Sequence, residues 1–164
     1  MAKVGILMGS KSDFEVVKPA VNTLKKFGVE VEVRVISAHR TPSEAHEFAA
    51  NAKGNGMEVI ICAAGKAAHL GGVIAAYTTL PVIGLPVKTD MMGGLDSLLS
   101  IVQMPAGIPV ATVGVNAGEN AGLLAVQMLS IKYKELAAKL ADYKTAMREK
   151  INADNEALQT MLGE

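Results

Sequence analysis

The sequence has 164 residues, of which 16 are basic and 16 are acidic, so its formal net charge at pH 7 is zero. This length fits one domain with its own core, and the charge balance argues against a nucleic-acid-binding protein, which would carry a basic excess. A single cysteine, Cys62, excludes an intrachain disulfide and a cysteine-built zinc site and suits a reducing cytoplasm. The mean hydropathy of +0.30 is high for a monomer and indicates apolar surface buried between subunits.

Short apolar runs alternate with helix-like segments along the first two thirds of the chain. This repeating strand–helix pattern predicts an α/β fold around a five-stranded parallel sheet. No linker, internal repeat or low-complexity tract interrupts it, so residues 1–164 are expected to form a single domain. The strands are expected at residues 4–8, 29–36, 59–62, 82–85 and 109–113.

Two stretches without any charged side chain, residues 67–87 and 97–118, are long enough to suggest membrane spans. Glycines and prolines divide each into a helix-length piece and a short strand-like piece, which is typical of strands buried on both faces. The start of the chain has too short an apolar run for a signal peptide. We therefore expect no membrane segment and a cytoplasmic protein.

Two helix starts carry local signals. Residues 12–15 and 41–44 both resemble capping boxes, in which a Ser or Thr and a later Glu bond the first turn reciprocally. The second box has Pro42 at the first helical position, where proline is favoured. Pro19 falls inside the first helix and predicts a kink there.

Beyond Asn120 the chain is expected to be helical to its end, and residues 130–164 form a tail past the last strand. Its apolar residues recur at helical spacings and form one stripe. The stripe is predicted to pack on a neighbouring subunit, and packing on its own domain is the alternative. Its members are Leu136, Leu140, Tyr143, Met147, Ile151, Leu158 and Leu162.

Chemically rich segments follow four of the predicted strands, at residues 9–13, 37–42, 64–69 and 86–88. In an open parallel sheet, ligands bind beyond the carboxyl ends of the strands, and these ends share one edge. The segments are therefore expected to form one site.

Several side chains in these segments suggest a role. The turn at residues 9–13 is either an anion site or an ordinary capped turn, and Asp13 could accept ribose hydroxyls. Arg40 can grip a phosphate in bidentate fashion, and the adjacent His39 can exchange protons near neutral pH. His69 is either a structural cap of the third helix or a catalytic group. Three histidines without clustered carboxylates predict no metal site. These residues indicate a site for a phosphate-bearing small molecule with an acid/base histidine, but they do not define a reaction.

A resemblance covers nearly the whole chain. The sequence resembles the phosphoribosylaminoimidazole carboxylase catalytic subunit family, whose bacterial members are N5-carboxyaminoimidazole ribonucleotide (N5-CAIR) mutases. The matching stretches are MGSKSD (residues 8–13), SAHRTP (37–42), AGKAAHLGGVIAA (64–76), LPVIGLPV (80–87), GLDSLLSIVQMPAGIPVATV (94–113) and NAGLLA (120–125).

The resemblance implies a flavodoxin-like three-layer αβα sandwich, a homo-octamer and an isomerase of de novo purine synthesis that uses neither a metal nor an organic cofactor. It implies that N5-CAIR is converted to 4-carboxy-5-aminoimidazole ribonucleotide (CAIR) by decarboxylation and recarboxylation, with His39 as the proton shuttle and His69 beside the imidazole. The resemblance further assigns substrate binding to Ser10, Ser12, Asp13, Ser37 and Arg40 around the ribose phosphate and to Ala64, Gly65, Lys66, Ala67 and Leu70 around the imidazole and the migrating carboxyl group.

The third loop departs from the commonest bacterial pattern, AGGAAHLPG, because this chain has Lys66 for the second glycine and Gly71 for the proline. Two other functions stay open. One is a direct carboxylase that uses aminoimidazole ribonucleotide (AIR) and free CO2, although related carboxylases usually carry Lys at the position of Arg40. The other is a non-enzymatic flavodoxin-like binding module, which would need aromatic residues or an acidic cluster that these loops lack.

Overall fold

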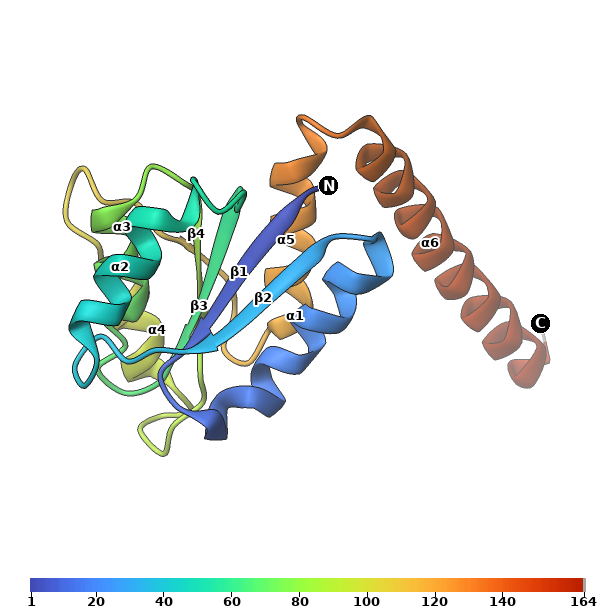
Figure 1. Ribbon diagram of the computed structural model, residues 1–164. Coiled ribbons are helices and arrows are strands. Elements are labelled where there is room, and N and C mark those ends of the chain that lie inside the picture. Colours follow the sequence, from blue (N-terminus) through green and yellow to red (C-terminus); the bar gives the residue numbers. More distant parts are fainter. Residues whose placement is uncertain (164) are drawn as a thin grey trace.

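A five-stranded parallel sheet forms the centre of the computed structural model, which describes residues 1–163 (Figure 1). The strands lie in the order β2-β1-β3-β4-β5, the order of flavodoxin-like folds. This confirms the predicted α/β fold class and the predicted succession of five strands along the chain. The strands are β1 (Lys3–Met8), β2 (Glu30–Val35), β3 (Val59–Ala64), β4 (Val82–Pro86) and β5 (Ala111–Thr112).

Helices cover both faces of the sheet and complete three layers (Figure 1). On one face lie α1 (Phe14–Phe27), which follows a short 3-10 helix, η1 (Lys11–Asp13), and α5 (Gly118–Ser130). On the other lie α2 (Pro42–Ala52), α3 (Leu70–Tyr77) and α4 (Leu95–Val102). Each face of the sheet therefore has its own apolar core.

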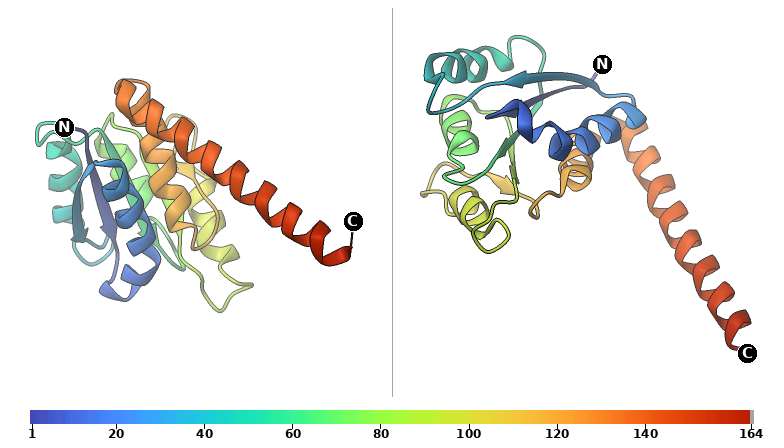
Figure 2. Two further views of the ribbon diagram at one scale, coloured as in Figure 1. Left: turned by 90° about the vertical axis from the view of Figure 1, so that its right-hand side faces the viewer. Right: turned by 90° about the horizontal axis from the view of Figure 1, so that it is seen from below.

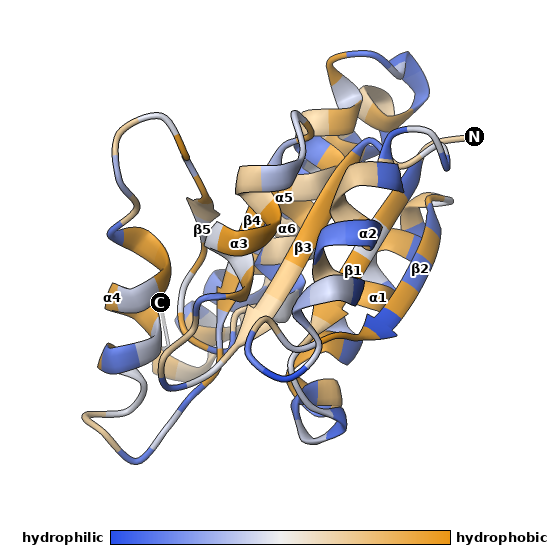
Figure 3. Ribbon diagram, turned by 60° about the vertical axis from the view of Figure 1, so that its left-hand side comes forward, coloured by the Kyte–Doolittle hydropathy of each residue, from blue (hydrophilic) through white to orange (hydrophobic). Residues whose placement is uncertain are grey.

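The strands differ in burial according to their place in the sheet. All six residues of the central strand β3 are buried, whereas the edge strand β2 has none that is fully buried. Figure 3 shows the same contrast, with β3 apolar along its length and β2 alternating between polar and apolar residues. Cys62 lies within β3, and complete burial raises the pKa of its thiol, as expected for a residue that packs rather than reacts.

Helices α1 and α5 approach each other closely because α5 carries glycine at the contact. A Cβ at Gly122 would lie 3.0 Å from the carbonyl oxygen of Ala20, and one at Gly118 would collide with the carbonyl of Val16. Pro19 lies at this same contact, and α1 continues through it without interruption. The proline therefore has a packing role that the helical pattern does not reveal.

The two uncharged stretches resolve as predicted, into α3 plus β4 and α4 plus β5. Within residues 1–163, no helix is both long and apolar enough to cross a membrane. The last strand is much shorter than the predicted residues 109–113, because only Ala111 and Thr112 pair, with Ile83 and Gly84 of β4.

The predicted capping boxes are wrong in their hydrogen bonds. Ser10, and not Ser12, caps the first turn, because its Oγ accepts from the Ser12 backbone N–H at 3.3 Å. Thr41 does precede α2, with Pro42 at the first position, but its hydroxyl turns back to Ser37. The Thr41 Oγ1 accepts from the Ser37 N–H at 3.0 Å and lies 3.1 Å from the Ser37 carbonyl oxygen, which fixes the loop before α2.

The tail is helical, but it is not continuous with α5. Residues 131–133 separate α5 from α6 (Lys134–Leu162), so the chain beyond Asn120 is helical in two pieces and not throughout. Residue 164 lies outside the described residues. The first turns of α6 pack on their own domain: Leu136 is buried, and the Tyr143 hydroxyl donates to Glu119 at 3.0 Å. The rest of α6 projects from the body (Figure 2).

Candidate active site

The loops after β1, β2, β3 and β4 converge on one cavity of about 580 Å³, here called the strand-end cleft. Its position beyond the carboxyl ends of the parallel strands is the one predicted for a ligand site. The structure brings together every residue that sequence reasoning or the resemblance assigned to the site. These are Ser10, Ser12, Asp13, Ser37, His39, Arg40, Ala64, Gly65, Lys66, Ala67, His69 and Leu70.

Arg40 joins the first two loops. Its Nη2 donates to the carbonyl oxygen of Gly9 at 2.6 Å, and its Nε donates to Ser37 Oγ at 3.3 Å. A guanidinium has five N–H donors, so three remain for an anion. Beside it, Ser12 Oγ lies 2.9 Å from Ser10 Oγ, which gathers two hydroxyls at the same end of the cleft. This end has the donors that a phosphate group requires.

Among residues 1–163, Asp13 is the one carboxylate that lines the cleft. Partial burial raises its pKa above the ordinary value of 3.8, and hydrogen bonds from Ser12 and Ser10 and the charge of Arg40 offset only part of this effect. The carboxylate oxygen Oδ1 lies 3.4 Å from Ser12 Oγ. A desolvated carboxylate is a good acceptor for ligand hydroxyl groups, because such a contact restores part of its lost hydration.

His39 and His69 meet although 30 residues separate them. His39 Nε2 lies 2.9 Å from His69 Nδ1, and the two rings are edge-to-face with centroids 5.0 Å apart. His69 is the N-cap residue of α3, but its side chain makes no capping hydrogen bond. The third histidine, His46, is exposed on α2 and packs against Tyr77. Only the first two imidazoles can share a proton.

Lys66 has an unusual backbone for its type. Its φ of +57° lies in the left-handed region, which favours glycine. Its carbonyl oxygen accepts from Ser100 Oγ of α4 at 3.3 Å, and its side chain is exposed at the cleft. Gly71, the other departure in this loop, lies in the first turn of α3 and is buried beside Val110 and Cys62.

Sequence reasoning placed Lys88 in the segment after the fourth strand but missed Thr89. Lys88 and Thr89 line the cleft, and the Lys88 backbone N–H donates to Asn116 Oδ1 at 2.8 Å. Thr89 Oγ1 donates to Asp96 at 2.5 Å. Extending the strand-end argument one residue past Lys88 would have found Thr89, whereas nothing in the sequence signals the contact with Asn116.

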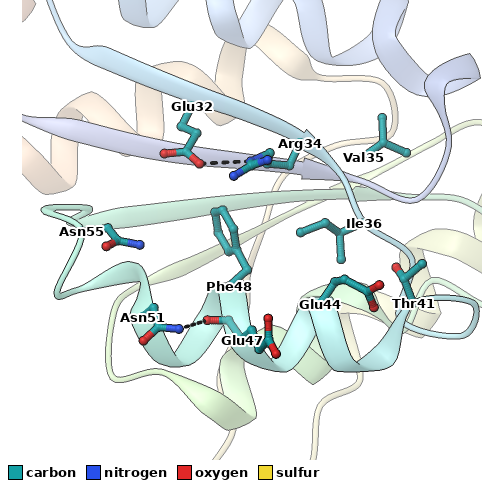
Figure 4. A pocket seen from close by; sticks show the side chains of 10 residues that line it. All are labelled: Glu32, Arg34, Val35, Ile36, Thr41, Glu44, Glu47, Phe48, Asn51 and Asn55. Atoms are coloured by element: carbon teal, nitrogen blue, oxygen red, sulfur yellow. Dashed lines mark hydrogen bonds and ion pairs between the residues drawn. The ribbon is translucent and has the colours of Figure 1, made fainter.

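A second hollow of about 450 Å³ lies between β2 and α2 and is here called the edge groove (Figure 4). Phe48 reaches into it from α2, and Arg34 pairs with Glu32 at 3.1 Å on β2. Its carboxylates outnumber its one guanidinium, so it disfavours anions. Its lining residues are Glu32, Arg34, Val35, Ile36, Thr41, Glu44, Glu47, Phe48, Asn51 and Asn55.

Within residues 1–163, no three His, Cys, Asp or Glu side chains come together as a metal-binding group. The strand-end cleft holds the imidazole pair, the Asp13 carboxyl and the cationic side chains of Arg40, Lys66 and Lys88. The chemistry that the described residues can offer is therefore proton transfer beside an anion-binding surface.

Comparisons with known proteins assign the chain to a family. The family model described as AIR carboxylase matches residues 3–150. The chain belongs to the AIR carboxylase family. It is 58% identical over 148 residues to the N5-carboxyaminoimidazole ribonucleotide mutase of Pyrococcus abyssi, covering 90% of this chain and 85% of that one.

Other relatives of this AIR carboxylase family member extend the similarity over the whole chain. The N5-carboxyaminoimidazole ribonucleotide mutase of Saccharolobus solfataricus is 52% identical over 162 residues, which is 99% of both chains. The crystal structure of Treponema denticola PurE superposes with a TM-score of 0.89 at 30% identity, covering 97% of this chain and 99% of that one. The tail helix thus lies within the aligned region.

Proposed function

We propose that this protein is an N5-carboxyaminoimidazole ribonucleotide mutase, an isomerase that converts N5-CAIR to CAIR in de novo purine synthesis. The observation that carries the proposal is the strand-end cleft, where a hydrogen-bonded imidazole pair lies beside a phosphate-binding set of side chains. The names of relatives at 52–58% identity support the same reaction.

The phosphate end of the substrate binds where Arg40 spans Gly9 and Ser37. The three free N–H groups of the guanidinium and the hydroxyls of Ser10 and Ser12 donate to its oxygens. Asp13 accepts from the ribose hydroxyls. This arrangement orients the ring toward the loop of residues 64–70, which holds the imidazole and the migrating carboxyl group.

The reaction moves a carboxyl group from the exocyclic nitrogen to ring carbon C4 and needs one proton donor that later becomes an acceptor. His39 protonates the nitrogen as its bond to the carboxyl carbon breaks and CO2 is released. C4 then forms a bond to the captive CO2, and His39 removes the C4 proton. The imidazole returns to its starting protonation state, so no other acid or base is consumed. Because CO2 is held beside C4, the second step is effectively unimolecular.

His69 orients His39 for this role. When His39 carries its extra proton, both of its ring nitrogens are donors, so His69 Nδ1 must accept across the 2.9 Å contact. This fixes His69 with its own proton on Nε2 and holds the ring of His39 in one direction. His69 is therefore a positioning residue for the proton shuttle.

The isolated chain leaves both imidazoles exposed. Loss of charge from a carbamate and retention of CO2 both benefit from the exclusion of water, so the working cleft needs further cover. We propose that a homo-oligomer, an octamer by resemblance, supplies it, with residues 130–164 of the single domain as the assembly arm. The apolar side chains Met147, Ile151 and Leu162 of α6 are 54–66% exposed in the single chain, as expected for a surface that a neighbour covers.

Removal of residues 147–164 tests the arm, because it spares Leu136 and Tyr143, which pack on their own domain. We expect light scattering to give a mass of eight chains for the intact protein and a smaller assembly for the truncated one. A truncated octamer would show that the arm does not hold the assembly.

The proposed site of action is the cytoplasm, whose reducing conditions suit the free thiol of Cys62.

The decisive assay for the reaction follows CAIR by absorbance at low bicarbonate with two substrates. One is N5-CAIR generated in situ, and the other is AIR alone. Rapid CAIR formation from N5-CAIR only supports the mutase. Saturable use of AIR with added CO2, and no use of N5-CAIR, would assign the protein to the direct carboxylases instead.

A further inference from the structure

Lys66 stands out from the other residues of the strand-end cleft by its backbone. Three non-glycine residues within 1–163 have a positive φ: Lys66, Met92 and Asn116. Asparagine adopts this conformation readily, whereas a lysine there is strained and glycine would relieve the strain. A long cationic side chain kept at such a position indicates that the side chain has a use.

The charge of Lys66 has no partner among the described residues. Its ammonium group makes no ion pair or hydrogen bond within residues 1–163, although the residue is exposed and lines the cleft. The Ser100 hydroxyl, which contacts the Lys66 carbonyl oxygen at 3.3 Å, anchors the strained backbone and leaves the side chain free. The backbone of Lys66 is thus held by a hydrogen bond, whereas its ammonium group has no partner within residues 1–163.

The cations of the cleft come from three loops, and Lys88, after β4, is the third of them. Arg40 lies with the serines after β1 and β2, tied to Gly9 and Ser37. Lys66 belongs to the loop after β3, three residues before His69, whose ring contacts His39. Because Arg40 and Lys66 line the same cleft from different loops, a ligand bound to Arg40 can present a second anionic group to Lys66.

We propose that Lys66 is a specificity-determining residue that binds the carboxylate of the carboxylated aminoimidazole nucleotide and so distinguishes it from the uncarboxylated nucleotide. The inference rests on the proposed function, in which substrate and product both carry this carboxylate and the uncarboxylated nucleotide lacks it. An unpaired lysine on the loop that leads to His69 supplies the charge-assisted hydrogen bond that only the carboxylated forms can accept.

The electrostatics predict which kinetic constant depends on Lys66. The ammonium stabilises the carbamate of the substrate and the carboxylate of the product, but it gives no comparable stabilisation to neutral CO2. An interaction made in the ground state and lost at the intermediate strengthens binding without accelerating the bond-breaking step. Loss of the charge therefore raises KM and leaves kcat unchanged or higher.

The test compares Lys66→Met, which keeps an unbranched side chain without charge, with Lys66→Arg, which keeps the charge. Lys53→Met, at an exposed position after α2, controls for the change in net charge. Isothermal titration calorimetry measures the affinity of each full-length protein for CAIR and for AIR. We expect Lys66→Met to weaken CAIR binding about tenfold, the effect of one charge-assisted hydrogen bond, and to change AIR binding less than twofold.

Lys66→Arg and Lys53→Met are expected to bind CAIR within about threefold of the natural protein. Equal weakening of CAIR and AIR would assign Lys66 to the phosphate, and unchanged CAIR affinity would show that it binds neither group; both outcomes overturn the inference. Turnover of N5-CAIR by the natural protein is measured first. Its absence refutes the proposed function, whereas normal turnover with unchanged CAIR binding in Lys66→Met refutes only the role of Lys66.

Discussion

The strand-end cleft and the edge groove flank the same segment, residues 36–41, and both could hold a small molecule. Residues 37–40 line the cleft, whereas Ile36 and Thr41 line the groove. Their volumes are similar, about 580 and 450 Å³. Size and location in the sequence therefore do not distinguish the site from its neighbour.

Charge does distinguish them. Three cations, Arg40, Lys66 and Lys88, line the cleft against one carboxylate, Asp13. The groove has the opposite balance, since three glutamates face one arginine. The cleft collects the loops that follow four parallel strands, whereas the groove lies along the side of β2. The anion-binding and proton-transfer groups therefore gather at the carboxyl edge of the sheet, and a hollow elsewhere on the surface does not acquire them.

The largest effect is expected from His39→Asn. Loss of the proton shuttle should lower kcat by about 10²–10⁴-fold, the usual contribution of a general acid–base group, while substrate affinity stays within about tenfold. Steady-state kinetics with N5-CAIR measures both quantities. His46→Asn is the matched control, because this histidine is exposed on the same chain segment but lines neither hollow, and its kcat should be unchanged. If His39→Asn converts N5-CAIR as fast as the natural protein, His39 is not the proton shuttle.

The arginines of the two hollows, Arg40 in the cleft and Arg34 in the groove, give the second prediction. Arg40→Ala should raise KM about 10–100-fold, since it removes charge-assisted hydrogen bonds to the phosphate, with a smaller change in kcat. Arg34→Ala removes the guanidinium of the groove, which pairs with Glu32, and should leave KM unchanged. Equal KM values for the two variants would contradict the assignment of the phosphate to the cleft.

Much of this architecture was predictable from the sequence, and the reasons are physical. The buried strands β1, β3 and β4 appear as continuous apolar runs because both faces of a parallel sheet are covered. The convergence of the four loops follows from parallel topology alone. The identity of the reaction came from the resemblance, because residue chemistry led only as far as a phosphate site with an acid/base histidine.

What the sequence did not reveal depends on contacts between distant segments. The Thr41 hydroxyl had a local capping role available but bonds to Ser37, because that bond closes the loop beside the cleft. The contact between His39 and His69 joins loops 30 residues apart, so no spacing rule could signal it. The sequence pattern also does not show where pairing stops in β5, of which only Ala111 and Thr112 pair with β4.

Asp13 in the cleft and Glu32 in the groove should make opposite contributions to the pH dependence of stability. Burial raises the pKa of Asp13 above 3.8, so ionisation of Asp13 costs the folded state stability as the pH rises through its pKa. A hydrogen bond from Lys3 lowers the pKa of Glu32 below 4.5, so Glu32 adds stability that is lost as the pH falls through its folded pKa. Asp13→Asn should therefore raise Tm at pH 7 but not at pH 3.

Glu32→Gln is the counterpart and should lower Tm at pH 7, with a difference that fades at pH 3. Differential scanning calorimetry of both variants across this range measures the two trends. Parallel pH dependence of the variants would mean that the two carboxylates have the same environment. The contrast between a desolvated carboxylate in the cleft and a cation-paired one in the groove would then fail.

The smallest effect is expected from Glu44→Gln/Glu47→Gln, which removes two of the three negative charges of the groove. Both side chains are exposed on α2, and at physiological ionic strength charges are screened over about 8 Å. KM for N5-CAIR should therefore change less than twofold at 0.15 M salt. At low salt, where screening weakens, removal of this negative field should lower KM slightly, because an anionic substrate approaches the neighbouring cleft. A large rise in KM at 0.15 M salt would mean that the groove contributes to substrate binding, and the separation of the two hollows would be wrong.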